Sequence, residues 1–338
     1  IPQRDYFDKD IANSDNTDGY YIIETNDFVY NPRKSTDAPY GPISSYKYPE
    51  AGIVSPLYLC FRAKQEINPL YFEWYFRSSA WHRYIYMSGD SGARHDRVSI
   101  KDDTFFAMPI NIPSAKEQDR IALFLNAIEQ KIDKQRSLVD ALKKYKRGLV
   151  KALISGTVAF AGSENKHWET VSLAEIFTIS AGGDIDRQNS SPTYSTSYPY
   201  PVYANALTNN GLYGYANYFK VEGDSITVSG RGEVGHAIAR HCKYVPIVRL
   251  LSLVPKYEDD VDFFAHIINA TSIYIESTGV PQLTSPQLGA VKVLRPPIWE
   301  QKRISSLLLK IDVKIENEEH LTLYLAKIRS SMLQQLFI

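Results

Sequence analysis

The sequence predicts an α+β fold in which two mixed α/β domains alternate with two long helices, arranged as an internal repeat. Two observations carry this prediction. One stretch of about forty residues occurs twice without a gap, from Pro113 and again from Pro296, at a constant offset of 183 residues. The segments around the two copies are rich in Tyr, Gly and Pro and contain short runs of β-prone residues. We therefore expect a domain followed by a helix, twice, over residues 1–112, 113–156, 157–295 and 296–338.

Each copy has the apolar spacing of a coiled-coil helix. Apolar residues recur every three or four positions, which forms a narrow seam rather than the wider stripe of a surface helix. The seam residues are Ile121, Leu125, Ile128, Ile132, Leu142, Ile304, Leu308, Ile311, Ile315 and Leu325. Such a helix needs a partner. The internal copy is the simplest candidate, and a helix of another chain is the alternative.

Both helices also carry signals for where they start and stop. Ser114 and Glu117 have the spacing of a capping box, and Pro297 suits a first turn because its missing N–H is not needed there. Ser155 and Gly156 mark the expected end of the first helix. About forty residues at ~1.5 Å each give a rod of roughly 60 Å.

The domains between the helices are expected to hold short strands and irregular loops. In the second domain the strand candidates are residues 171–180, 225–229, 236–240 and 248–254. The first domain repeats their order, since a short strand and an Arg-bearing turn follow both Asp27 and Asp224. Trp168 precedes Asp224 by 56 residues, whereas 26 residues precede Asp27. By this comparison the first domain is expected to lack about thirty residues on its amino-terminal side.

Composition points to a cytoplasmic protein. The sequence has no run of eighteen apolar residues that could span a membrane, and residues 1–10 lack a signal-peptide pattern. Cys60 and Cys242 lie far apart in hydrophobic contexts, which indicates buried thiols rather than a disulfide. The formal net charge is zero, but residues 114–151 hold ten Lys/Arg and five Asp/Glu. This local excess of five positive charges indicates either a solvated helix face or a rod that follows phosphates or an acidic partner.

No motif of a catalytic, metal or cofactor site stands out. The sequence contains no GxxxxGK loop, no GxGxxG and no Asn-Pro-Pro-aromatic motif of methyltransferases; residues 30–34 (YNPRK) come nearest. The histidines show no metal-ligand spacing with the two cysteines. We therefore expect a non-catalytic chain without a metal or cofactor of its own.

Taken together and in their order along the sequence, these features resemble those of the specificity subunit of a type I restriction–modification enzyme. The resemblance covers essentially the whole chain. The resemblance rests on the helix starts IPSAKEQDRI (112–121) and PPIWEQKRI (296–304). It also rests on the loops GARH (92–95) and TGVPQLT (278–284) and on the segment TVSGRGEVGHA (227–237). Each motif is weak by itself, but their order, repeated, is specific.

The resemblance implies two target-recognition domains, each reading one half of a split, asymmetric DNA sequence. It implies that the two helices pack as an antiparallel coiled coil, related by a pseudo-twofold repeat, and set the spacing between half-sites. The implied partners are double-stranded DNA, two methyltransferase subunits that modify adenine N6, and restriction–translocase subunits. S-adenosylmethionine, ATP and Mg²⁺ would belong to those partners and not to this chain.

The candidate DNA contacts are polar loop residues, because Arg, Lys, Asn and Gln side chains read base edges and bind phosphates. They are Arg33, Lys34, Arg94, His95, Arg97, Arg187, Asn209, Asn210, Tyr213, Arg231 and Gln282. For each Arg the alternative role is a surface ion pair, and the loop 278–284 could equally be a junction between domain and helix.

Two other functions stay open on the sequence alone. The chain could be the recognition region of a fused restriction–methyltransferase enzyme whose catalytic domain lies upstream. It could also be a coiled-coil scaffold that does not bind DNA. A binding affinity that falls steeply with salt concentration would exclude the scaffold, because such a fall reports phosphate contacts.

Overall fold

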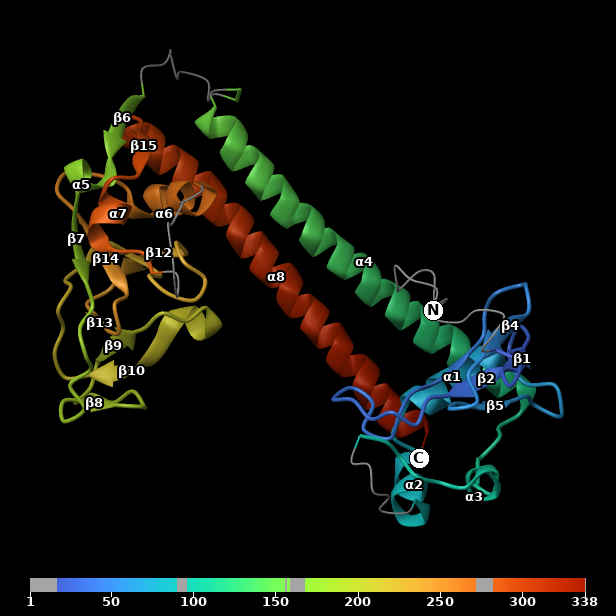
Figure 1. Ribbon diagram of the computed structural model, residues 1–338. Coiled ribbons are helices and arrows are strands. Elements are labelled where there is room, and N and C mark those ends of the chain that lie inside the picture. Colours follow the sequence, from blue (N-terminus) through green and yellow to red (C-terminus); the bar gives the residue numbers. More distant parts are fainter. Residues whose placement is uncertain (1–16, 90–95, 156, 159–167, 272–281, 338) are drawn as a thin grey trace. The chain divides into compact units, whose positions relative to one another are not determined.

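The computed structural model describes residues 17–89, 96–155, 157–158, 168–271 and 282–337. The chain divides into a first unit, residues 1–137 with 320–338, and a second unit, residues 138–319. Two long helices, α4 (Ala115–Ile154) and α8 (Ile298–Leu336), contribute to both units (Figure 1). Each unit therefore combines one α/β domain with a part of each long helix.

The second unit is built on an antiparallel four-stranded sheet. Its strand order is β12 (Ala237–His241), β11 (Asp224–Val228), β14 (Leu251–Pro255) and β7 (Phe177–Ala181). A second sheet has the order β13 (Val245–Pro246), β9 (Tyr200–Tyr203), β10 (Leu212–Ala216) and β8 (Ser190–Ser191). A two-stranded pair joins β15 (Lys292–Arg295) to β6 (Glu169–Ser172). The remaining short elements are α5 (Leu173–Ile176), the 3-10 turn η2 (Thr208–Gly211) and α7 (Ser285–Gly289).

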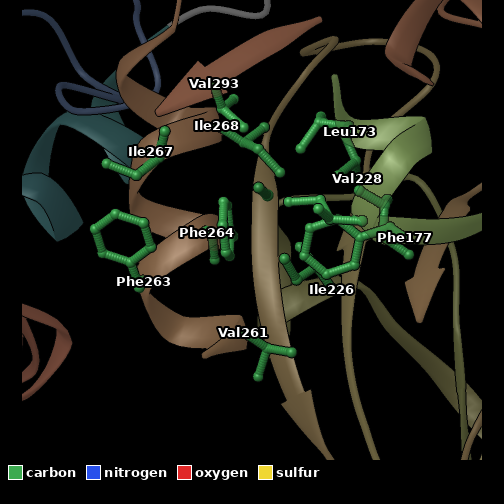
Figure 2. Packing of buried hydrophobic residues seen from close by; sticks show 14 of the residues in the cluster. Leu173, Phe177, Ile226, Val228, Val261, Phe263, Phe264, Ile267, Ile268 and Val293 are labelled. Atoms are coloured by element: carbon green, nitrogen blue, oxygen red, sulfur yellow. The ribbon is translucent and has the colours of Figure 1, made fainter. Parts of the chain in front are cut away.

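Helix α6 (Val261–Ala270) supplies the centre of the core in this unit. Asp260 starts the helix by accepting a hydrogen bond from the backbone N–H of Phe263 at 2.8 Å. Phe263 and Phe264 are fully buried, and the ring of Phe264 meets Phe177 of β7 edge-on at 5.3 Å between centroids. Figure 2 shows Phe264 and Phe177 on the side of the helix that faces Ile226 and Val228 of strand β11. The helix thus covers one face of the four-stranded sheet.

The prediction of one strand over residues 171–180 is wrong. The chain leaves β6 at Ser172, makes the single turn α5, and enters β7 at Phe177. A capping box causes the turn, since Glu175 accepts a hydrogen bond from the backbone N–H of Ser172 at 2.7 Å. The predicted strand 248–254 is also too long, because β14 begins only at Leu251.

The first unit has a smaller sheet and an aromatic core. Its strands are β3 (Ile43–Ser45), β2 (Phe28–Tyr30) and β5 (Leu59–Phe61), with β1 (Tyr21–Ile23) paired to β4 (Gly52–Val54). Its short helices are α1 (Pro69–Arg77), α2 (His82–Ser88) and α3 (Asp102–Phe106). Tyr30 stacks on Phe105 at 5.0 Å, and buried Trp81 donates its indole N–H to the carbonyl of Phe76 at 3.0 Å. Aromatic packing therefore holds the strands to the helices.

Within each unit the two long helices run in opposite directions and are joined by ion pairs. In the first unit Arg329 Nη1 lies 2.5 Å from Glu129 Oε2. In the second, Lys146 Nζ lies 2.5 Å from Asp312 Oδ1, and Lys143 Nζ lies 2.6 Å from Glu319 Oε1. At the offset of 183 residues, Glu129 corresponds to Asp312, and Lys146 corresponds to Arg329. The internal repeat thus produces the same ion pair twice, once in each unit.

The predicted seam residues lie in these helix contacts. Half of them are buried, namely Leu125, Ile132, Ile304, Leu308 and Ile315. The other half are partly buried, namely Ile121, Ile128, Leu142, Ile311 and Leu325. The apolar spacing of three and four residues therefore follows the side of each helix that is shielded from water.

Each domain core is completed by the start of one long helix and the end of the other. In the first unit, Leu125 of α4 joins the same buried cluster as Phe337, which follows α8 and contacts Tyr71 at 5.4 Å between rings. In the second unit, Leu153 near the end of α4 joins the same cluster as Ile304 near the start of α8. The two domains are thus tied to the helices in the same way.

A buried glutamine makes the corresponding junction in both units. The side-chain oxygen of Gln118 accepts a hydrogen bond from the backbone N–H of Asn68, the residue that caps α1, at 3.0 Å. Gln301 accepts from the backbone N–H of Asp260, which caps α6, at 2.9 Å. Both amides also donate to the carbonyl of the proline five residues earlier. The glutamine of the repeated Glu-Gln at the helix starts therefore has a structural role.

Candidate nucleic-acid interface

Three loops of the second unit meet at Gly230. The backbone N–H of Gly230 donates to Asn205 Oδ1 at 2.7 Å, and Asn205 Nδ2 donates to the carbonyl of Val248. The N–H of Leu283 donates to the carbonyl of Gly230 at 2.9 Å. A Cβ on Gly230 would lie 2.9 Å from the carbonyl oxygen of Arg249, so the approach of these loops requires glycine.

The loops that meet at Gly230 carry Arg231, Arg249 and Gln282, which we call the arginine cluster. Gln282 Oε1 accepts from Arg231 Nε at 3.2 Å, from Arg231 Nη2 at 2.9 Å and from Arg249 Nη1 at 2.9 Å. Both arginines are exposed. Among the residues that the structure describes, no carboxylate forms an ion pair with either guanidinium group. The cluster therefore presents two positive charges to solvent.

The backbone under the cluster is strained. Val248 and Arg249 have φ values of +49° and +63°, a region that L-residues rarely adopt and that a β-branched residue adopts least readily. Their N–H groups donate to the carbonyls of Gly183 and Gly182, both at 2.9 Å. These hydrogen bonds hold the two residues in place, so the direction in which Arg249 leaves the backbone is fixed.

The predicted contacts Asn209, Asn210 and Tyr213 lie on a neighbouring hairpin. Asn209 and Asn210 are exposed and both have a φ of +51°, which Asn tolerates better than most residues. Tyr213 is 59% exposed at an irregularity in the pairing of β10 with β9. Buried Arg240 supports the hairpin by donating from Nη2 to the carbonyl of Asn210 at 2.7 Å.

Arg187, the remaining candidate of the second unit, is exposed in a turn that the side chain of Asp186 organises. Asp186 Oδ1 accepts from the N–H of Gln188 at 3.1 Å, and Oδ2 accepts from Asn189 Nδ2 at 2.8 Å. Hydrogen bonding from the Asn189 side chain lowers the pKa of Asp186. Within the described residues no hydrogen bond or ion pair joins Arg187 to the arginine cluster.

In the first unit the structure brings three of the five candidates together. Arg33 and Arg97 face each other in an antiparallel bridge. The N–H of Lys34 donates to the carbonyl of Asp96, and the N–H of Val98 to that of Pro32, both at 2.8 Å. Arg33 and Lys34 are exposed and Arg97 is partly buried. The other two candidates, Arg94 and His95, lie outside the described residues.

The sequence pattern does not reveal Arg249 as a candidate contact. It predicts a strand that includes Val248 and Arg249, but in the structure this strand begins later, at Leu251. The signal that could have corrected this was Pro246, because proline is rare inside a central strand and indicates an edge or a bend. Arg249 then follows the bend rather than lying within a buried strand.

The histidines show no catalytic arrangement in the described residues. Partial burial opposes protonation of His241, but its hydrogen bonds to Asp224 and Asp262 outweigh this and raise its pKa. Burial, with the charge of Lys146 nearby, lowers the pKa of His266. No group of three or more His, Cys, Asp or Glu in the described part of the chain could hold a metal ion. Cys60 and Cys242 are free thiols.

The model of a known protein family matches the segment of the chain that contains the arginine cluster. Residues 165–325 match the Type I restriction modification DNA specificity domain. This part of the chain is similar to the DNA specificity domains of type I restriction–modification systems. The resemblance that the sequence indicated is thereby confirmed, and the specificity domain includes Arg231, Arg249 and Gln282.

Two proteins of Mycoplasma pneumoniae that bear the name type I specificity subunit illustrate the relationship. One is 26% identical over 200 residues, which are 59% of this chain and 54% of that protein. The other is 31% identical over 145 residues, 43% of this chain and 42% of that protein. The chain thus spans about half the length of these curated relatives.

Solved structures extend the likeness to the whole fold. A chain from a study of complex assembly in the type I R-M system matches with a TM-score of 0.63 at 16% identity, over 94% of this chain and 82% of that one. The S subunit of a type I restriction–modification system from M. genitalium matches with a TM-score of 0.56 at 17% identity, over 97% and 87%. The predicted layout of two domains and two long helices is therefore confirmed. In the described residues no helix is both long and apolar enough to cross a membrane.

Proposed function

We propose that this chain is the DNA-reading specificity subunit of a type I restriction–modification system. Each α/β domain reads one half of a bipartite, asymmetric target in double-stranded DNA. The two long helices set the gap between the half-sites. The chain performs no chemistry of its own and works in the cytoplasm.

The observation that carries this proposal is the arginine cluster, because it lies within the matched specificity domain. Two guanidinium groups that share one amide oxygen, without a carboxylate partner among the described residues, favour an anionic ligand rich in acceptors. DNA offers such acceptors on phosphates and on guanine edges. The exposed Arg33 and Lys34 of the first unit are the proposed contacts to the other half-site.

The long helices are the proposed docking sites for two methyltransferase subunits. Leu123 and Phe124 of α4 are 68% and 49% exposed, and Leu323 and Tyr324 of α8 are 66% and 62% exposed. Large apolar side chains that stay in water on a helix favour contact with a protein partner. Restriction–translocase subunits would join the same assembly. S-adenosylmethionine, ATP and Mg²⁺ would be bound by these partners.

Long-read mapping of N6-methyladenine tests the proposal. Cells that express the full-length gene with its neighbouring methyltransferase are compared with cells that lack only this gene. We expect a split motif that is methylated only when the chain is present. Methylation that is unchanged without the chain would contradict the proposal and favour a scaffold that does not bind DNA.

A further inference from the structure

The arginine cluster offers hydrogen-bond donors and no free acceptor. Gln282 Oε1 already accepts from both arginines, so the part of its amide that remains available is the NH₂ group. The reverse orientation of the amide would place this NH₂ group against two guanidinium ions, so the donors themselves fix the orientation. Arg231 uses its Nε–Nη2 edge on Gln282, whereas Arg249 uses only Nη1. Among the described residues the Nε–Nη2 edge of Arg249 has no hydrogen-bond partner, so this edge can bind two acceptors at once.

We propose that Arg249 reads a guanine in the half-site of the second unit, and that Gln282 and Arg231 are positioning residues that hold its guanidinium plane. This inference rests on the proposed function. In the major groove guanine presents two neighbouring acceptors, O6 and N7, which match the free edge of Arg249. Adenine presents an acceptor beside an amino donor, and cytosine presents an amino donor, so each would face Arg249 with a donor.

The fixed geometry favours a base contact over a phosphate contact. A phosphate oxygen can be reached from many directions, so a flexible Lys or Arg serves it without support. Arg249 instead leaves a backbone held at a φ of +63° by two successive hydrogen bonds to the carbonyls of Gly182 and Gly183. Its side chain is held a second time by Gln282. Both the backbone and the side chain of Arg249 are thus held in one orientation. A contact to a base edge requires a fixed orientation, because the acceptors of a base lie in defined directions.

The carbonyl groups of Val248 and Gly230 in the supporting loops accept hydrogen bonds within the protein. Asn205 Nδ2 occupies the carbonyl of Val248, and the N–H of Leu283 occupies that of Gly230. The loops that carry Arg249, Arg231 and Gln282 are thereby locked to one another. This arrangement would keep the spacing between the two guanidinium groups constant when DNA binds.

The experiment selects bound duplexes from a randomised double-stranded DNA library with the full-length chain and three variants. Arg249→Lys keeps the charge and the backbone but loses the bidentate edge. Gln282→Met keeps the size of the side chain but removes the shared acceptor. Arg136→Lys makes the same Arg-to-Lys change on the exposed surface of α4, where Arg136 pairs with Asp133 at 3.3 Å, and is the matched control. Thermal unfolding checks that each variant is folded.

We expect Arg249→Lys to lower the preference for guanine at one position of one half-site by roughly ten- to a hundred-fold, with the other positions unchanged. Gln282→Met should weaken the preference at the same position by a smaller factor. Arg136→Lys should select the wild-type motif. These results would identify Arg249 as the base-reading residue.

Two outcomes overturn the inference while the proposed function stands. In the first, Arg249→Lys selects the same motif with the same stringency as wild type. In the second, Arg249→Lys or Gln282→Met lowers the affinity equally for all sequences, which would assign Arg249 to a phosphate. A wild-type chain that selects no sequence at all would instead overturn the proposed function.

Discussion

Two single residues, Gln118 and Gln301, have a structural role at the junctions between domains and long helices, and this role can be tested. Each is at most 4% exposed, and each amide links the cap of a domain helix to the proline before a long helix. Truncation to Ala would leave a backbone N–H and a carbonyl, most of them partly buried, without these partners, at a cost of up to about 1–3 kcal/mol for each group. We expect Gln118→Ala and Gln301→Ala to lower the midpoint of thermal unfolding clearly.

The matched control for this prediction is Gln130→Ala, because Gln130 is exposed on α4 and the same substitution there buries nothing. Its midpoint of thermal unfolding should stay close to that of wild type. If the three alanine variants unfolded at the same temperature, the junction glutamines would not have the structural role that their hydrogen bonds indicate.

His241 should make the stability of the second unit depend on pH. Its hydrogen bonds to Asp224 and Asp262 raise its pKa in the folded chain, so protonation favours the folded state. The stability that this provides is fully present below the pKa of the unfolded chain and is lost as the pH rises through the folded pKa. We expect the difference in free energy of unfolding between wild type and His241→Gln to be larger at about pH 5.5 than at about pH 8.5.

Denaturant titration at both pH values measures this difference. The comparison with His241→Gln cancels the opposite contribution of His236 and His266, whose pKa values are lowered mainly by burial. A difference that grows as the pH rises would show that the two carboxylates do not favour protonated His241.

Residue types alone located part of the candidate interface. Arg231 and Gln282 were predicted because Arg and Gln are common base-reading residues on loops, and the structure places them in contact. Arg249 was missed because its importance depends on a strained backbone and on hydrogen bonds to glycines that lie more than sixty residues earlier. Such tertiary contacts leave no local pattern in the sequence.

At the scale of elements, the ion pairs between the long helices can be tested by exchanging their charges. Lys146→Glu would place a carboxylate against Asp312, to which Lys146 Nζ now lies 2.5 Å away. Because both side chains are partly exposed, we expect a loss of about 1 kcal/mol in the free energy of unfolding. The double variant Lys146→Asp with Asp312→Lys should recover most of this loss.

The repeat supplies a matched experiment on the other pair. Arg329→Glu should act on Glu129 as Lys146→Glu acts on Asp312, and the exchanged pair should again recover stability. Urea titration of all variants at pH 8 gives the free energies. Failure of both exchanged pairs to recover stability would mean that the ion pairs contribute nothing measurable.

The elements were predictable to different degrees. The long helices followed from a seam repeated at constant offset, and both begin within two residues of the predicted starts. The short strands were harder, because a segment of four or five residues is decided by its neighbours. Residues 171–180 show this, since the capping box at Ser172 interrupts an apolar run that otherwise has the composition of a strand.

At the scale of the whole molecule, the spacer role of the helices can be tested by lengthening both. Seven residues preserve the coiled-coil seam and add about 10 Å, which corresponds to roughly three base pairs at 3.4 Å each. We expect a heptad inserted in each helix, at positions 183 residues apart, to widen the gap of the methylated motif by about three base pairs. Both half-sites should stay the same. Mapping of N6-methyladenine reads out the result, and a motif with altered half-sites and an unaltered gap would exclude the spacer role.

The packing of Phe337 against Tyr71 has a consequence for how the protein is made. A ribosome delivers about 5–20 residues per second, so the aromatic residues of the first unit emerge long before the side chain that completes their core. The first unit therefore cannot finish folding during the synthesis of its own domain and must wait until the chain has been translated through Phe337. A premature stop codon shortly before Phe337 would harm the part of the protein that was made first.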